Sequence, residues 1–271
     1  GERYMAKNKK DIKIIVAAHK KYHMPENSCY LPLHVGKKGK DDLGYLGDDT
    51  GDNISEKSPY YCELTGLYWA WKNLDEDYIG LVHYRRYFSM HRRSSFENVL
   101  TYEELRPYLG RIRLFVPKKR NYFIETLYSH YEHTHYIEQL DLTRTIIKEK
   151  YPQYISAFDI VVNRKSAYMF NMAIMDKRLL NEYCTWLFDI LFELENRIDM
   201  PDLNAFQSRF YGRISEIIFN VWLEYKIENK SLSKYKIMEL NCIHLEKINW
   251  YKKGKAFLKA KFCGEKYQGS F

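Results

Sequence analysis

Three clusters of basic side chains each follow a short apolar run in the sequence. The clusters are His19-Lys20-Lys21, His83–Arg86 and Lys118–Arg120. Arginine and lysine side chains bind phosphate oxygens, and the arginine fork does so through two parallel hydrogen bonds. If the clusters meet in the fold, we expect them to bind a diphosphate, with His19 and Lys20 on the nucleotide side of that ligand.

The segment Tyr78–Phe88, with the sequence YIGLVHYRRYF, carries the strongest of these signals. Its first half is typical of a buried strand, and its second half places His83, Arg85 and Arg86 at the exit of that strand. A basic surface turn that closes a strand would have the same pattern. The position after a buried strand favours the diphosphate-binding interpretation.

Acidic and polar residues gather at a second place, in the segment DLNAFQSRFYGRISE that begins at Asp202. A carboxylate at the start of a helix can act as a general base on a hydroxyl group. Asp202 and Glu216 are therefore candidate catalytic residues, and Gln207 and Arg209 are candidate ligand contacts. A helix N-cap with surface ion pairs explains Asp202 equally well.

Three histidines, His130, His133 and His135, lie in the segment SHYEHTHY, which looks helical. On a helix, His130 and His133 share a face and His135 lies away from them. We therefore favour acceptor contacts or surface histidines over a zinc site, and assign His133 to acceptor or sugar contacts. Asn171 receives the same assignment, because it is a polar residue inside an apolar run.

The apolar pattern predicts alternating strands and helices, which is typical of an α/β fold with a parallel sheet. The predicted strands are Asp11–Ala18, Tyr30–Gly36, Tyr78–Val82, Arg113–Val116 and Ala167–Met175. Helices are predicted after Pro59, through most of residues 121–165, and around Leu180–Leu194 and Ile214–Tyr225. Residues 37–53 are predicted to form a long binding loop. Ligands of such sheets bind beyond the carboxyl ends of the strands.

Composition narrows the classes of protein further. The chain has 271 residues, is 45% hydrophobic and carries a net charge of +8. Its lysines and arginines are dispersed and no nucleic-acid motif is present, so we expect no nucleic-acid partner. The five cysteines show no metal-type spacing, and no run of 18 apolar residues or signal peptide is apparent, which indicates a cytoplasmic protein.

Several motifs together resemble a family of bacterial capsular and exopolysaccharide biosynthesis proteins, once catalogued as a domain of unknown function and later grouped with glycosyltransferases that include galactofuranosyltransferases. The motifs are GYLGDDTGDNIS (44–55), YCELTGLYWAWKN (61–73), DYIGLVHYRRYF (77–88), HYEHTHY (130–136), MFNMAIM (169–175) and FQSRFYGRISEIIFNVWL (206–223). The resemblance covers roughly residues 11–225.

The resemblance implies a GT-A-like nucleotide-sugar-binding sheet flanked by helices over residues 1–250, followed by a basic aromatic tail, 251–271. It implies a UDP-sugar donor, with UDP-galactofuranose as the best guess, and inversion to a β-linkage. His83, Arg85 and Arg86 would face the diphosphate. Asp202, with Glu216 as the substitute, would take the acceptor proton.

The cofactor and the partners of the chain are likewise expectations from the sequence and from the family resemblance. The Asp-x-Asp metal motif of nucleotide-sugar enzymes is absent after Tyr78–Val82, so no metal ligand is assigned, and a requirement for Mn²⁺ or Mg²⁺ stays open. The resemblance implies a polysaccharide or lipid-linked oligosaccharide acceptor. Residues 251–271 would then contact the inner face of the cell membrane. A non-catalytic polysaccharide-binding or assembly protein is the alternative.

Overall fold

A mixed β-sheet forms the centre of the molecule. The computed structural model describes residues 9–122, 124–200 and 202–245, and eight strands of this part form one sheet in the order β3-β2-β1-β4-β5-β10-β6-β9, with β9 also paired to β4. The strands are β1 (Ile12–Ala18), β2 (Tyr30–His34), β3 (Leu46–Gly47), β4 (Tyr78–His83), β5 (Arg86–Ser89), β6 (Leu114–Pro117), β9 (Ala173–Asp176) and β10 (Ile237–His244). A separate pair is formed by β7 (Arg120–Asn121) and β8 (Ser166–Ala167).

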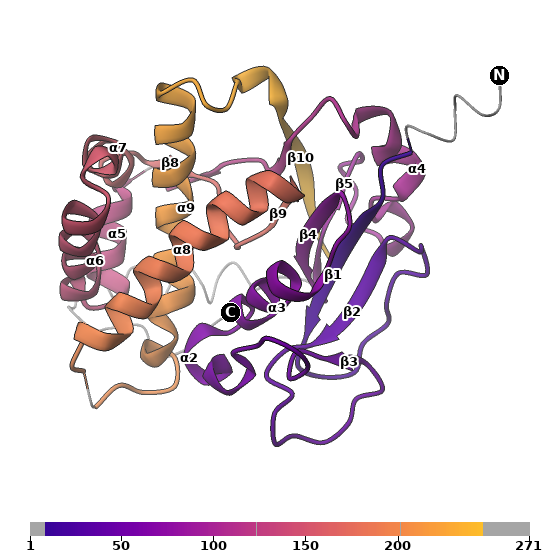
Figure 1. The fold of residues 1–271 in the computed structure, drawn as a ribbon, viewed down its shortest axis with the longest axis horizontal. Helices are drawn as coiled ribbons and strands as arrows, with labels where there is room; N and C mark the ends of the chain where they lie inside the picture. Colours follow the sequence, from indigo (N-terminus) through magenta and orange to yellow (C-terminus); the bar gives the residue numbers. More distant parts are fainter. Residues whose placement is uncertain (1–8, 123, 201, 246–271) are drawn as a thin grey trace.

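Helices pack mainly against one face of this sheet (Figure 1). They are α2 (Ser58–Tyr61), α3 (Leu64–Asn73), α4 (Tyr102–Leu105), α5 (Leu127–Thr134), α6 (Ile137–Lys150), α7 (Ile155–Val162), α8 (Lys177–Arg197) and α9 (Phe210–Glu228). Short 3-10 turns are η2 (Ser55–Lys57), η3 (Phe96–Asn98), η4 (Arg106–Tyr108), η5 (Pro152–Tyr154), η6 (Gln207–Arg209) and η7 (Lys234–Lys236). No helix in the described ranges combines the length and the apolar character that crossing a membrane requires.

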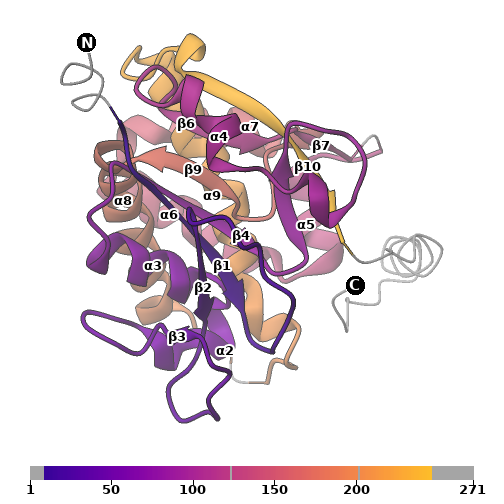
Figure 2. The ribbon, with the colours of Figure 1, turned by 90° about the vertical axis from the view of Figure 1, so that its right-hand side faces the viewer.

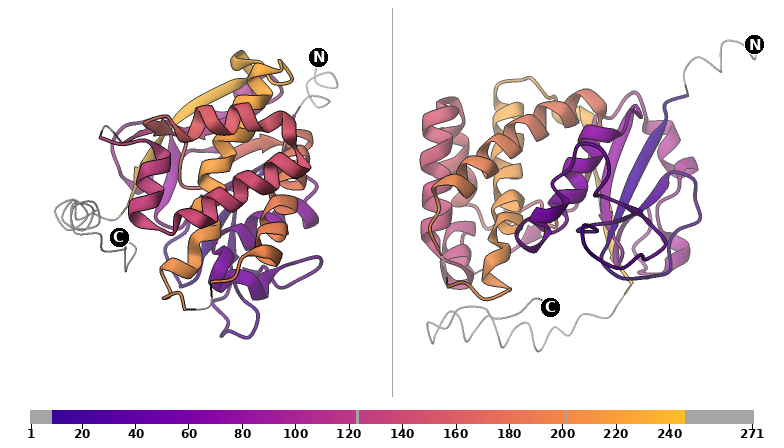
Figure 3. Two further views of the ribbon diagram at one scale, coloured as in Figure 1. Left: turned by 90° about the vertical axis from the view of Figure 1, so that its left-hand side faces the viewer. Right: turned by 60° about the horizontal axis from the view of Figure 1, so that its bottom comes forward.

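The period-2 alternation of the strands divides the core into two layers. On β1, Ile15 and Ala17 face the layer that contains α3, α8 and α9, whereas Ile14 and Val16 face the opposite layer. The helical layer is thick, with α5, α6 and α7 stacked outside α8 and α9 (Figure 3). The opposite layer is thin, and α4 with its neighbouring loops covers it (Figure 2). Both faces of the central strands are therefore buried, which explains their continuous apolar runs.

The predicted parallel sheet is correct for one half only. Strands β2, β1 and β4 are parallel, but β9 runs antiparallel to both β4 and β6, and β5 runs antiparallel to β10. The two-residue connection Tyr84-Arg85 between β4 and β5 is too short for the crossover that a parallel pair requires. The carboxyl ends of β1 and β4 still lie at the same edge of the sheet, which is the edge that the basic clusters follow.

Two further strand predictions need correction. The predicted strand Ala167–Met175 is split, because Phe170 and Asn171 adopt left-handed backbone angles between β8 and β9. Strand β10 was not predicted, since its polar residues Glu239 and Asn241 interrupt the apolar pattern. The predicted tail 251–271 lies outside the described residues.

The loop 37–53 is held by one buried carboxylate, Asp48, which is fully inaccessible to solvent. Its two oxygens accept hydrogen bonds from the backbone N–H groups of Gly36 and Lys37 and from the hydroxyls of Ser55 and Thr65. A carboxylate with four donors is well compensated for its burial. Asp48 therefore fixes this loop to β2 and to the start of α3.

Replacement of Asp48 by alanine leaves these four donors without their acceptor. We expect Asp48→Ala to lower the free energy of unfolding by about 3 kcal/mol, measured by urea denaturation. The exposed neighbour provides a matched control, and Asp49→Ala should change the free energy by less than about 0.5 kcal/mol. Equal effects of the two substitutions would contradict the anchoring role of Asp48.

Candidate functional site

The charges of basic side chains from four separate segments act on His19 at the exit of β1. Burial lowers the pKa of His19, and the positive charges of Lys20, Arg85, Arg209 and Lys40 lower it further, in that order. Arg85 follows β4 and Arg209 ends η6, so residues far apart in the sequence place their charges around one point. This arrangement favours a neutral imidazole and attracts an anionic ligand.

The ring of Tyr84 contacts the side chains of this basic region. The His19 ring meets it edge-on at 5.3 Å between centroids, and the Arg85 guanidinium lies 4.9 Å from its centre. The Lys20 ammonium lies 5.7 Å from the same centre. Contacts of cations with an aromatic face hold their positive charges in fixed places without neutralising them. Tyr84 therefore holds His19, Lys20 and Arg85 around one ring.

A strained turn lies next to the basic region. Phe170 has φ 73° and Asn171 has φ 53°, and a left-handed angle is unfavourable for a bulky residue such as phenylalanine. Asparagine tolerates this conformation better than most residues, which explains its presence in an otherwise apolar run. Such strain persists only where surrounding contacts hold it, and it is concentrated at functional sites in proteins.

Four side-chain contacts hold the turn in place. His83 Nε2 lies 2.7 Å from the Phe170 carbonyl oxygen, and the Phe170 N–H donates to Glu216 Oε2 at 3.1 Å. The Asn171 amide donates to Glu63 Oε1 at 2.9 Å and to the Gly212 carbonyl at 3.0 Å. The turn thereby joins the end of β4, the start of α3 and the first turns of α9.

Two carboxylates, Glu63 and Glu216, therefore lie beside His83 at one point of the sheet edge. Burial lowers the pKa of His83, and the charge of Arg86 lowers it further, whereas the two carboxylates act in the opposite direction. The guanidinium of Arg86 lies 4.2 Å from the centre of the Phe170 ring. The site thus has a basic half around His19 and, at the turn, an acidic half that contains the two carboxylates and borders Arg86.

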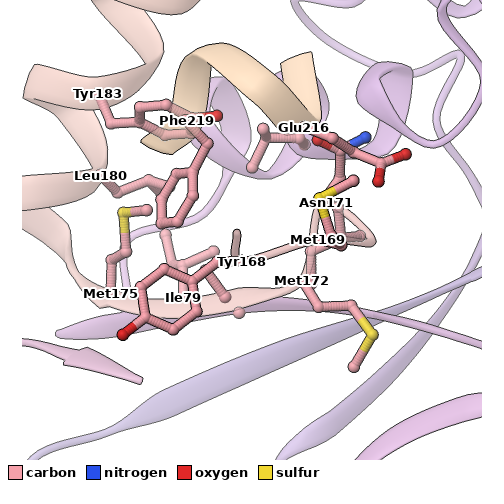
Figure 4. Close-up of a pocket in the computed structure, with 14 residues that line it drawn as sticks. Ile79, Tyr168, Met169, Asn171, Met172, Met175, Leu180, Tyr183, Glu216 and Phe219 are labelled. Atoms are coloured by element: carbon pink, nitrogen blue, oxygen red, sulfur yellow. The ribbon is translucent and has the colours of Figure 1, made fainter. Parts of the chain in front are cut away.

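An apolar cavity lies behind the turn (Figure 4). Asn171 and Glu216 lie together at one end, and Met175, Leu180 and Phe219 lie at the other. The cavity holds about 30 Å³, which is far below the volume of a pocket for a nucleotide or a sugar. It is a gap in core packing beside the turn.

The histidine segment forms a neighbouring polar cluster. His133 Nδ1 lies 2.8 Å from the buried Glu125 carboxylate, and Gln207 donates to the Thr134 carbonyl at 3.1 Å. Two of the predicted contacts, His133 and Gln207, therefore both lie at the end of α5. In the described ranges, no three His, Cys, Asp or Glu side chains gather as a metal site would require.

Arg213 connects this cluster to the turn. Its guanidinium donates to His130 Nδ1 at 3.2 Å and lies 3.7 Å from Glu216 Oε2. Its side chain is only 11% exposed. Since Arg213 donates to this nitrogen of His130, the imidazole must be neutral there.

The predicted residues are thus distributed unevenly. His19, Lys20, Arg85 and Arg209 form the basic half. Their companions His83, Arg86, Asn171 and Glu216 lie at the turn. Asp202 is exposed in the segment before η6, and that segment uses Asn204, not Asp202, to accept the Gln207 N–H at 2.8 Å.

Sequence reasoning missed Glu63, Arg213 and the conformation of Phe170. Glu63 follows Cys62, whose φ of 51° is also left-handed, and nothing in its sequence surroundings distinguishes it from a surface residue at a helix start. The spacing of Arg213 and Glu216, three apart on one helix face, was a usable signal for an ion pair.

Comparison with known proteins agrees with this architecture. Residues 13–229 match the family described as Domain of unknown function (DUF4422), and the chain belongs to this family. The chain is similar to the apo structure of WbbM, a bifunctional glycosyltransferase, with a TM-score of 0.81 and 32% sequence identity over 88% of this chain and 46% of that one. The chain therefore spans about half the length of WbbM, and its fold is GT-A-like. No curated protein matches it.

The neutral state of His130 makes stability depend on pH. Burial, and then the charge of Arg213, lower the pKa of His130 from 6.5 to about 2. The unfolded chain therefore binds a proton below pH 6.5 that the folded chain does not, so this contribution to stability is present above that pH and is lost as the pH falls.

We expect His130→Gln to reduce the pH dependence of the free energy of unfolding by about 1.4 kcal/mol per pH unit between about pH 6 and pH 5. Urea denaturation at several pH values measures this slope. His23→Gln is the control, because His23 lies on the opposite side of the sheet beside Phe96. An unchanged slope in His130→Gln would mean that His130 is protonated in the folded protein.

Proposed function

We propose that the chain is a glycosyltransferase that transfers a sugar from a nucleotide donor to a carbohydrate acceptor. The observation that carries the proposal is the division of the site into two halves, with cations around His19 and two carboxylates at the strained turn. A diphosphate leaving group needs positive charge, and an acceptor hydroxyl needs a proton acceptor. The similarity to WbbM supports the same reaction class.

In this proposal, the basic half binds the donor. Lys20, Arg85 and Arg209 attract the diphosphate, and Arg86 faces the negative charge that develops on the leaving group. Lys20 and Arg85 are positioned by strand exits and by their contacts with Tyr84, so little reorganisation of these two side chains is needed on binding. UDP is the preferred nucleotide, and UDP-galactofuranose is the specific donor that we propose.

The acidic half activates the acceptor. Glu216 is held by the Phe170 N–H and by Arg213, and we assign it the role of general base on the acceptor hydroxyl. Attack on the face opposite the leaving diphosphate gives inversion, and hence a β-linkage. Asp202 is the alternative base. Because it is exposed on a loop, its position is held less firmly than that of Glu216.

The acceptor belongs to the same proposal. A growing polysaccharide or a lipid-linked oligosaccharide at the inner membrane face is the acceptor that the resemblance in sequence implies. A non-catalytic polysaccharide-binding protein has no use for the basic half of the site, so nucleotide binding separates the two functions.

Loss of one arginine from the basic half should weaken nucleotide binding. We expect Arg85→Ala to raise the Kd for UDP by about 10- to 100-fold, because one charge-assisted hydrogen bond to the diphosphate is lost. Isothermal titration calorimetry measures this constant. Arg92 is an exposed arginine on another turn, and Arg92→Ala should leave the Kd within about twofold. If the two variants bind UDP equally well, Arg85 does not contact the diphosphate.

Glu216→Gln preserves an acceptor for the Phe170 N–H but removes the base. We expect kcat to fall by about 10²- to 10⁴-fold with little change in the Kd for UDP. Asp202→Asn and Glu63→Gln, assayed in parallel, should lose less. A larger loss in either of these two variants would transfer the role of base to that residue.

A further inference from the structure

A second cavity lies between α7, α9 and β10, on the helical side of the sheet. It encloses about 340 Å³, which is in the range of pockets that bind small ligands. We call it the α7–α9 cavity. Its charged lining residues are Lys119, Arg164, Lys234, Glu224 and Glu239, and Ser166, Tyr168 and Asn220 add uncharged polar groups.

Both signs of charge are present in this cavity. Arg164 Nη1 lies 2.9 Å from Glu224 Oε2, and Glu239 forms a hydrogen bond with the Tyr168 hydroxyl. The ammonium of Lys119 lies 5.2 Å from the centre of the Tyr168 ring. Three cations and two carboxylates leave little net charge to select an anion, and the many polar groups disfavour an apolar ligand. Sugar hydroxyls, which both donate and accept hydrogen bonds, match donors and acceptors placed side by side.

The cavity also has a fixed relation to the strained turn. Tyr168 lines it and lines the small apolar cavity beside Asn171 as well. Asn220 holds the Tyr168 backbone from both sides, accepting from its N–H and donating to its carbonyl, each at 2.8 Å. The Tyr168 backbone is therefore held in place two residues before Phe170.

Lys119 gives a second connection to the candidate site. It precedes Arg120, whose charge lowers the pKa of His130 and of Arg86. The wall of the cavity formed by Lys119 and Tyr168 thus adjoins the groups around the turn. A chain of sugars whose end lies at the turn can reach this cavity with a more distant residue.

We propose that the α7–α9 cavity binds a sugar residue of the acceptor chain, apart from the residue that receives the transferred sugar. This inference rests on the proposed glycosyltransferase function and specifies how the acceptor is recognised. Lys119 and Glu239 supply the donor and acceptor of hydrogen bonds to the sugar hydroxyls, and the Tyr168 ring supplies an apolar surface.

The test uses methyl glycosides of galactose, glucose and mannose as probes, with saturation-transfer difference NMR as the readout. The full chain of 271 residues should bind at least one of these glycosides. The double variant Lys119→Ala/Glu239→Ala should lose at least about tenfold in affinity for that probe. Both side chains are exposed, so folding should be retained. Glu228→Ala, at the end of α9 and outside the cavity lining, is the matched control.

UDP binding is measured on the same samples and separates the two claims. Retention of UDP binding with loss of the glycoside supports the sugar subsite. No glycoside binding to the parent protein, or equal binding to the double variant, overturns the subsite and leaves the donor site standing. Failure of the parent protein to bind UDP, with the glycoside still bound as predicted, contradicts the proposed transferase function instead.

Discussion

The turn at Phe170 and Asn171 is the constraint on which the site depends. Two consecutive left-handed residues cost free energy of about 1–3 kcal/mol each in an unsupported chain. Here the carbonyl and N–H of Phe170 are bound to His83 and Glu216, and the Asn171 amide is bound to Glu63. These bonds come from three different elements, so the turn fixes β4, α3 and α9 relative to one another.

The same bonds separate the charges of the site. Glu63 and Glu216 are bound to the turn, whereas the charges of Lys20, Arg85 and Arg209 act on His19. Positive and negative halves that are held apart by the fold can act on the two different partners of a transfer reaction.

The sequence predicted the parts of this architecture that depend on local pattern. Buried strands such as β1 and β4 were predictable from their runs of apolar, largely β-branched residues. The basic residues that follow these strands indicate the proposed ligand-binding edge. The left-handed turn was not predictable, because Phe170 is a poor residue for that conformation and only tertiary contacts stabilise it. Glu63 was missed for a related reason, since its role is defined by a residue 108 positions away.

The order of the strands was also set by tertiary structure. Strand β10 pairs with both β5 and β6, and no local sequence pattern predicts that a strand is inserted between these two. In contrast, the residues at the exits of β1 and β4 were placed correctly, because parallel neighbours bring their carboxyl ends to one edge. The positions of these residues were therefore predictable where two neighbouring strands run parallel.

The central claim is that the basic half of the site binds a nucleotide sugar and that the acidic half completes its transfer. The most direct measurement is nucleotide release from a panel of UDP- and GDP-sugars, with an oligosaccharide acceptor and with either Mn²⁺ or EDTA. The account predicts release of UDP from at least one UDP-sugar, and release should depend on Arg85 and Glu216. The absence of release from every donor, together with no binding of UDP, would contradict it.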